Sequence, residues 1–119
     1  MNTRFEYVYR NASNYKQWGA VVFAGLANEA MERRLVASLD AHEFFIAGQV
    51  RVPEVFFHDG TAVEGDPCWH EFVALELTTE ETNDRHGRSI DAFVTECESA
   101  ARDGWATFDL RTREMSGHW

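Results

Sequence analysis

The sequence contains few of the features that identify a particular chemistry. It has two cysteines, two prolines and eight glycines. These numbers are too small for a disulfide framework or a long flexible linker. The sequence also has no G-x-x-x-x-G-K-[ST] or G-x-G-x-x-G phosphate-binding motif, no G-x-S-x-G elbow, no C-x-x-C pair and no H-E-x-x-H. We therefore predict no catalytic residue and no cofactor.

Basic residues are also scarce. The chain has 11 Lys and Arg residues and 20 Asp and Glu residues, so its formal net charge is −9. Because such a surface repels phosphates, direct nucleic-acid binding is not expected. The simplest role of the charge is solubility. The alternative is that the carboxylates imitate phosphates and occupy the groove of a basic protein partner.

Long apolar runs are absent. No stretch approaches the roughly 18 residues of a membrane-spanning helix, so no membrane association is predicted. Residues 1–6 lack a basic segment followed by an apolar run, so a signal peptide is not expected either. Cys68 and Cys97 are consistent with free thiols in a reducing compartment. The sequence therefore predicts a cytoplasmic protein.

Apolar residues are nevertheless plentiful. The chain of 119 residues is 45% hydrophobic, with nine Phe and four Trp. This is enough apolar area for one real core, and it argues against disorder. We expect a single domain that spans residues 1–119.

Residues 69–77 are predicted to form the central strand of a sheet. Side chains on a strand alternate between its faces, so Val73 and Leu75 would lie on one face and Phe72 and Ala74 on the other. Because both faces carry apolar groups, we expect protein to cover both.

Two helices are predicted from caps and helical spacing. Asn28 and Ser89 are each suited to accept hydrogen bonds from the first turn of a helix. Apolar residues then recur every three or four positions. The predicted helices lie near 28–41 and 89–103.

The remaining strands complete an α+β protein. Further strands are predicted at 4–10, 18–26 and 105–110, with a weaker one inside 43–57. The expected fold is a two-layer sandwich with a mostly antiparallel sheet of four or five strands and two helices. One possible topology is ferredoxin-like with an extra N-terminal strand. The second face of the sheet would be covered by the tail, by residues 43–57, or by a second copy in a homodimer.

A group of aromatic, amide and basic residues lies around the tip of the first hairpin. The candidate ligand-binding residues are Tyr7, Tyr9, Arg10, Asn14, Tyr15 and Lys16. Aromatic faces and cations of this kind can hold a small anionic or planar ligand. Alternatively, the tyrosines face the core, Asn14 forms the turn, and the cations are solvated.

The pattern Tyr9-Arg10-x-x-Ser13-Asn14-Tyr15-Lys16, followed by a strand into Gly25, resembles the N-terminal part of small uncharacterised bacterial proteins. The resemblance covers about the first third of the chain. It implies a bacterial cytoplasmic setting and no particular activity.

A second group could bind a metal. The candidate ligands are His58, Cys68, His70 and Glu71. Zinc takes thiolate, imidazole and carboxylate ligands, and on a strand Cys68 and His70 share a face. Alternatively, His70 and Glu71 are ordinary polar residues at a strand end and Cys68 is a small buried group.

The functional prediction follows mainly from what is missing. We predict a small acidic, non-catalytic protein-interaction module that acts through a protein partner or self-association, of the kind that serves as a bacterial or phage inhibitor or regulator. The alternative is a small-ligand-binding protein or metal-dependent enzyme that uses the hairpin tip and the His58, His70 and Glu71 region. In that case His70 is a candidate acid–base group.

Overall fold

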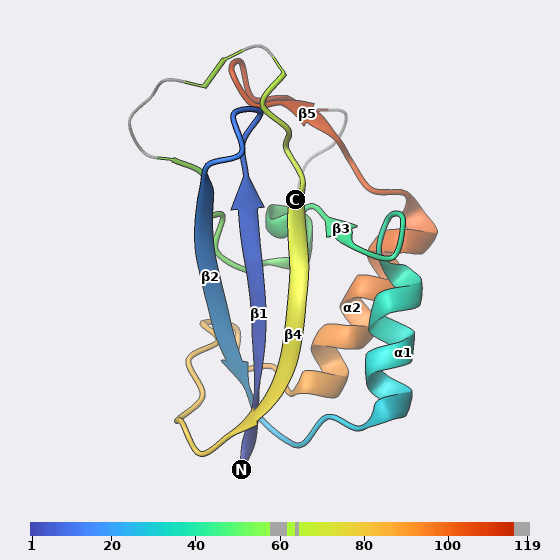
Figure 1. Ribbon diagram of the computed structural model, residues 1–119. Coiled ribbons are helices and arrows are strands. Elements are labelled where there is room, and N and C mark those ends of the chain that lie inside the picture. The colour runs from blue at the N-terminus through green and yellow to red at the C-terminus, as the bar shows by residue number, and fades with distance from the viewer. Residues whose placement is uncertain (58–61, 64, 116–119) are drawn as a thin grey trace.

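The computed structural model describes residues 1–57, 62–63 and 65–115, and it shows a sheet layer packed against a helix layer (Figure 1). The elements in chain order are β1 (Asn2–Arg10), β2 (Lys16–Phe23), α1 (Glu29–Ser38), β3 (Phe44–Phe45), the 3₁₀ turn η1 (Ala47–Val50), β4 (His70–Thr78), α2 (Ile90–Asp103), β5 (Phe108–Asp109) and β6 (Glu114–Met115). The predicted class, an α+β sandwich with an antiparallel sheet and two helices, is confirmed.

The order of the strands differs from a ferredoxin-like sheet. Four strands lie side by side in the order β2-β1-β4-β3, and every neighbouring pair is antiparallel. The first strand is therefore not an addition at the edge, because β1 pairs along its length with β2 on one side and β4 on the other. Strand β5 pairs only with β6, outside this sheet.

A β-bulge explains why β4 looked apolar on both faces. The register opposite β1 shifts between Glu6, which faces Ala74, and Tyr7, which faces Phe72, so that Val73 is the extra residue. Phe72 and Leu75 are three positions apart, yet both pack against the same core. Among the described residues, none covers β4 at Val73, whose side chain is 42% exposed.

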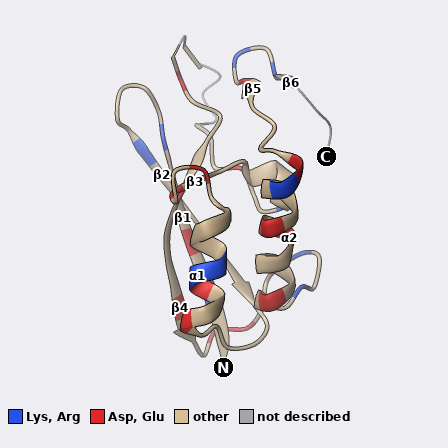
Figure 2. Ribbon diagram, turned by 90° about the vertical axis from the view of Figure 1, so that its right-hand side faces the viewer, with Lys and Arg blue, Asp and Glu red and all other residues tan. Residues whose placement is uncertain are grey.

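Both helices cover one face of the sheet (Figures 1 and 2). Phe5 of β1 lies at the centre of the core between them, with its ring centroid 4.8 Å from that of Phe93 and 5.5 Å from that of Phe45. Phe23 stacks on Phe93 at 4.4 Å. Leu35 of α1 belongs to the same core cluster as these rings and is fully buried. None of the described helices is long and apolar enough to cross a membrane.

The predicted caps start both helices. The Asn28 side chain accepts a hydrogen bond from the Met31 N–H over 2.9 Å, and the Ser89 hydroxyl accepts one from the Ala92 N–H over 3.0 Å. Helix α2 ends at Gly104, whose φ of 91° favours a residue without a side chain. The second helix therefore matches its predicted range closely, whereas α1 ends at Ser38, earlier than predicted.

The last part of the chain covers one end of the molecule instead of adding a strand. Phe108 packs with Ile46 and Cys68 in a second, smaller cluster. Trp105 contacts both clusters, and its indole N–H donates to the carbonyl of Ser38 over 3.1 Å. The prediction of a strand over 105–110 holds only for two residues. Residues 116–119, at the end of the predicted tail, lie outside the described residues.

The sheet face opposite the helices is open, and we call it the outer face (Figure 1). It carries Arg4, Glu6 and Trp18, since these alternate with the core-facing residues of β1 and β2. Val8 lies on the same face as its partner Trp18, although it is itself buried. In the part of the chain that the structure describes, the elements expected as a cover pack elsewhere. The 43–57 segment contributes Phe45 and other residues to the core under the helices, and β5 packs in the end cluster.

Candidate functional site

The residues predicted at the hairpin tip separate onto two faces of the sheet. Tyr7 belongs to the core, where it is fully buried and its hydroxyl donates to the Pro53 carbonyl over 2.6 Å. Tyr9 is buried on the same face, and its hydroxyl donates to the Pro67 carbonyl over 2.8 Å. Burial raises the pKa of both phenols, so both are neutral donors. Tyr7 is therefore a packing residue and is not available to a ligand.

Arg10 and Asn14 lie on the other face. The Arg10 guanidinium donates to Glu71 from Nε over 3.0 Å and to the Asn14 side-chain oxygen over 2.6 Å. Asn14 has a φ of 67°, a left-handed conformation that Asn tolerates in turns. Lys16 is exposed. Since Arg10 is already paired with Glu71 and Asn14, these residues stabilise the turn and leave no free guanidinium for a ligand.

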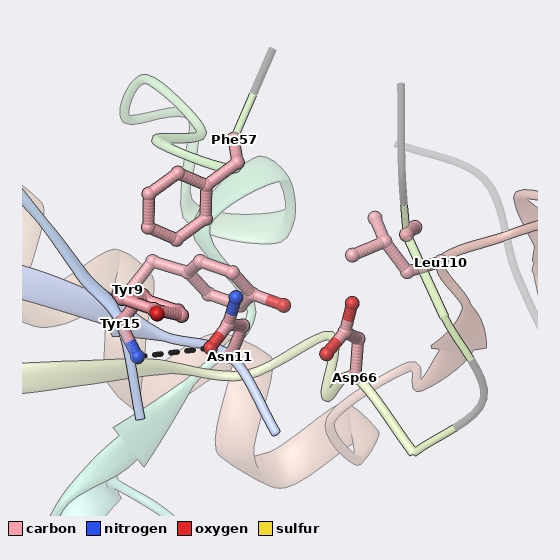
Figure 3. Close-up of a pocket in the computed structure, with 7 residues that line it drawn as sticks. Tyr9, Asn11, Tyr15, Phe57, Asp66 and Leu110 are labelled. Carbon is pink, nitrogen blue, oxygen red and sulfur yellow. Dashed lines mark hydrogen bonds between the residues drawn. The ribbon is translucent and has the colours of Figure 1, made fainter. Parts of the chain in front are cut away.

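A small pocket remains beside the hairpin, and we call it the hairpin pocket (Figure 3). Its volume is about 260 Å³, and its lining residues are Tyr9, Asn11, Tyr15, Phe57, Ala62, Asp66 and Leu110. Asn11 accepts from the Tyr15 N–H over 2.9 Å, and Asp66 accepts from the backbone of Ala12 and Val63. The polar groups of the pocket therefore stabilise the loops, and the aromatic rings are the groups that could contact a ligand.

The described members of the predicted metal set do not converge. His58 lies outside the described residues. Cys68 packs in the end cluster, His70 faces the main core, and Glu71 lies on the outer face with Arg10. Adjacent strand residues point to opposite faces, which separates His70 from Glu71. Within the described ranges, no three His, Cys, Asp or Glu side chains are grouped as metal ligands would be.

His70 is a core residue surrounded by rings. Its side chain is fully buried, and its ring centroid is 4.8 Å from that of Phe56 and 5.3 Å from that of Tyr9. Nε2 accepts a hydrogen bond from the Val55 N–H over 3.0 Å. Burial lowers the pKa of His70 to about 4, although the Cys68 backbone raises it slightly. A neutral imidazole closed off from solvent cannot serve as the acid–base group of the alternative hypothesis.

Both cysteines are free and buried, and burial raises the pKa of each thiol. Thiols of this kind are poor nucleophiles, because the reactive form is the thiolate. Neither cysteine supports covalent catalysis.

Many of the carboxylates on which the phosphate-mimicry hypothesis depends are paired with arginines. Arg4 binds Glu6, Glu76 and Glu80, and Arg34 binds Asp91 and Glu98. Figure 2 shows that acidic positions do follow α2. Pairing reduces the charge that they present to a partner, which weakens the hypothesis of phosphate mimicry.

Sequence reasoning missed a buried ion pair before α2. The Arg88 side chain is 7% exposed and the Asp84 side chain 3%. Arg88 donates to both oxygens of Asp84 over 2.9 Å and to the carbonyls of Val50 and Arg51 over 2.7 and 2.8 Å. The Asp84-x-x-x-Arg88 spacing just before the Ser89 cap was the available signal. This pair ties the 79–89 loop to η1.

The tied loop forms one wall of a groove beside β2. The groove has a volume of about 460 Å³ and is lined by Ala20, Val21, Gly48, Arg51, Val52, Pro53, Asn83, Asp84, Arg85 and His86. Arg51 makes two hydrogen bonds to Glu96, and Asp84 is bound to Arg88. The side chains of Arg85 and His86 are exposed and have no ion pair with any described residue. The unpaired charge at the groove is therefore positive.

The outer edge of β2 is only partly closed. At Val22 the N–H donates to the Asn83 side chain over 2.8 Å, and the C=O accepts from the Asn83 N–H over 3.1 Å. Because these directions repeat every second residue, the N–H and C=O groups of Lys16, Trp18 and Ala20 also point outward. No described residue is hydrogen-bonded to them. We call Lys16 to Ala20 the free β2 edge.

Trp18 adds an apolar group at this edge. Its side chain is on the outer face and is 63% exposed, and Tyr15 just before β2 is 68% exposed. Large aromatic residues of this kind are enriched at binding sites. The free β2 edge therefore has unpaired backbone groups, an exposed indole on one side and the groove on the other.

Comparisons with known proteins add no functional assignment. No protein-family model, curated protein or solved structure matches this chain.

Proposed function

We propose that this protein is a small non-catalytic interaction module that binds an extended segment of another protein along the free β2 edge. The observation that carries the proposal is the row of outward N–H and C=O groups at Lys16, Trp18 and Ala20. A peptide can add a strand to such an edge, with affinity supplied by main-chain hydrogen bonds and specificity by pockets for alternate side chains.

The chain already illustrates this binding mode at Val22. Asn83 makes there the donor and acceptor contacts that a residue of an added strand would make. The loop thus closes one end of the edge and leaves the other end open. Folded proteins usually cover or block long free edges, so an unblocked one is a feature that function can explain.

A bacterial cytoplasm agrees with the resemblance of the N-terminal pattern and with the buried free thiols. The net charge of −9 favours a protein partner over nucleic acid. A regulatory or inhibitory role would suit a domain without a catalytic group.

The test uses peptides of defined chemistry. We would select binders from a phage-displayed library of random octapeptides, synthesise one, and methylate its backbone nitrogens at odd or at even positions. An added strand directs only alternate N–H groups toward β2. We expect one methylated peptide to lose at least about tenfold in affinity by calorimetry, and the other to retain it.

The control keeps the peptide and changes the edge. Ala20→Pro removes an N–H that points outward and so leaves the β1–β2 ladder intact. This variant should fold, as judged by circular dichroism, but not bind. The proposal fails if no peptide is selected, if the two methylated peptides bind equally, or if the amide resonances of residues 16–20 do not shift on binding.

The hairpin pocket supports a second candidate function, the binding of a small planar molecule. The supporting observation is the pocket of about 260 Å³ lined by the rings of Tyr9, Tyr15 and Phe57. A thermal-shift screen against nucleosides, flavins and aromatic acids would test it. A hit should be lost in Tyr15→Ala and kept in Trp18→Ala, and a screen without hits would remove this candidate.

A further inference from the structure

We infer that the segment bound at the free β2 edge carries an acidic side chain, Asp or Glu, that enters the groove between β2, residues 48–53 and residues 83–86. This inference rests on the proposed function and specifies the chemistry of the partner.

The geometry brings an added strand over the groove. A strand beside Lys16–Ala20 would lie about 4.8 Å outside β2, with alternate side chains on the two faces of the sheet. One set would lie near Trp18 on the outer face. The other set would lie on the helix side, where Ala20 and Val21 form the β2 wall of the groove. Gly48 presents no side chain there, which leaves room at the base.

The charges of the groove favour a carboxylate. Asp84 is neutralised by Arg88, with 2.9 Å between the Arg88 Nη2 and the Asp84 Oδ1 atoms, and Arg51 is neutralised by Glu96 at 2.6 Å. Arg85 remains without an ion pair to any described side chain. On a chain of net charge −9, this groove is a place where an acidic peptide meets uncompensated positive charge.

The same charges disfavour a second copy of this chain as the occupant. Strand β2 reads Lys16-Gln-Trp-Gly-Ala-Val-Val-Phe23 and contains no carboxylate. An antiparallel pair of β2 strands centred on Trp18 would place Lys16 of one copy opposite Ala20 of the other. Lys16 and Ala20 share the outer face with Trp18, so the side chains on the groove side would be those of Gln17 and Gly19, and neither offers a carboxylate to Arg85.

The experiment is a double-mutant cycle between the peptide and the protein. The probe is the octapeptide selected above, together with a version in which its acidic residue is replaced by the corresponding amide. We expect the amide peptide to bind wild type about threefold to tenfold more weakly, as for an exposed ion pair. Arg85→Ala should remove most of this difference, and so should 500 mM NaCl.

Controls distinguish this inference from the proposed function. Arg33→Ala alters an arginine that is also exposed but lies on α1, and it should preserve the discrimination. If the acid and amide peptides bind wild type equally, while methylation at alternate positions still weakens binding, the preference for an acidic side chain is wrong and the strand edge stands. Loss of the alternating pattern would overturn the strand edge itself. A wild-type dimer that Ala20→Pro dissociates would show that a second copy is the occupant and would overturn the inference.

Discussion

Arg88 is the buried cation around which the 79–89 loop is organised. Its guanidinium carbon lies 5.3 Å from the ring centroids of both Phe23 and Phe93, while its nitrogens satisfy Asp84 and two backbone carbonyls. Burial of the Asp84 carboxylate is tolerated because Arg88 keeps the pKa of that group below its usual value, against the effect of desolvation. The groove beside β2 therefore depends on one buried pair.

Arg88→Met should destabilise the protein by about 3 kcal/mol or more, because it leaves Asp84 buried and uncompensated. Urea unfolding followed by fluorescence would measure the change. Arg33→Met is the matched control, since the Arg33 side chain is 74% exposed, and it should change stability by less than about 0.5 kcal/mol. A loss of under about 1 kcal/mol in Arg88→Met would show that the pair has little structural weight.

His70 should make stability depend on pH. Burial lowers its folded pKa to about 4 from an ordinary value of 6.5, so between these values the unfolded chain binds a proton that the folded chain does not. Its contribution is fully present above pH 6.5 and is lost as the pH falls toward 4. The difference corresponds to about 3 kcal/mol.

His70→Gln should reduce this loss, since an amide oxygen can still accept from Val55 but cannot titrate. The free energy of unfolding at pH 7 and pH 4.5 would be compared with that of wild type. His42→Gln changes an exposed histidine and should leave the pH dependence intact. If the free energy of unfolding falls equally with pH in wild type and in His70→Gln, other groups cause the loss of stability in acid.

At the scale of elements, β2 can pair closely with β1 only because it contains Gly19. A Cβ atom at Gly19 would lie 2.7 Å from Cζ and 2.8 Å from Cε2 of Tyr7. Glycine usually weakens a strand, but here it makes room for a buried aromatic ring. Gly19, within the free β2 edge, therefore also determines how Tyr7 packs in the core.

Gly19→Ala should therefore destabilise the protein by about 1–3 kcal/mol, the usual cost of overpacking. Thermal unfolding would report the loss, and near-ultraviolet circular dichroism would show a disturbed Tyr7 environment. Ala20→Val adds bulk to the neighbouring exposed position and should be nearly neutral. Wild-type stability in Gly19→Ala would mean that Tyr7 moves without cost.

At the scale of the whole molecule, the outer face is open but not uniformly apolar. Arg4 of β1 binds Glu6 over 2.8 Å and Glu76 of β4 over 2.7 Å, on the same face as the exposed Trp18. Pairing two copies through this face would desolvate these ions, which costs more than their mutual attraction returns unless their geometry is excellent. The sequence pattern could not show this row, because its members come from β1 and β4.

We therefore expect a monomer. Size-exclusion chromatography with light scattering at about 1 mM protein should give the mass of one chain, 13.6 kDa. If the protein is a dimer and Trp18→Asp is a dimer as well, the homodimer predicted from the apolar pattern of 69–77 is supported, and its interface does not include Trp18.

Local signals determined most of the secondary structure. The Asn28 and Ser89 caps and Gly104 mark helix ends through hydrogen bonds or backbone conformations within a few residues, so their meaning survives without tertiary context. Alternation likewise located β1. The class of the fold followed from these elements.

Only the tertiary structure decided which strand lies in the middle, which face is open and where the candidate site lies. The bulge at Val73 brings Phe72 and Leu75 to one face, although strict alternation places them on opposite faces. The free edge and its groove combine residues about 30 positions apart or more, including Ala20, Arg51 and Arg85. Such contacts depend on the path of the whole chain, and no local pattern of charge or hydrophobicity encodes them.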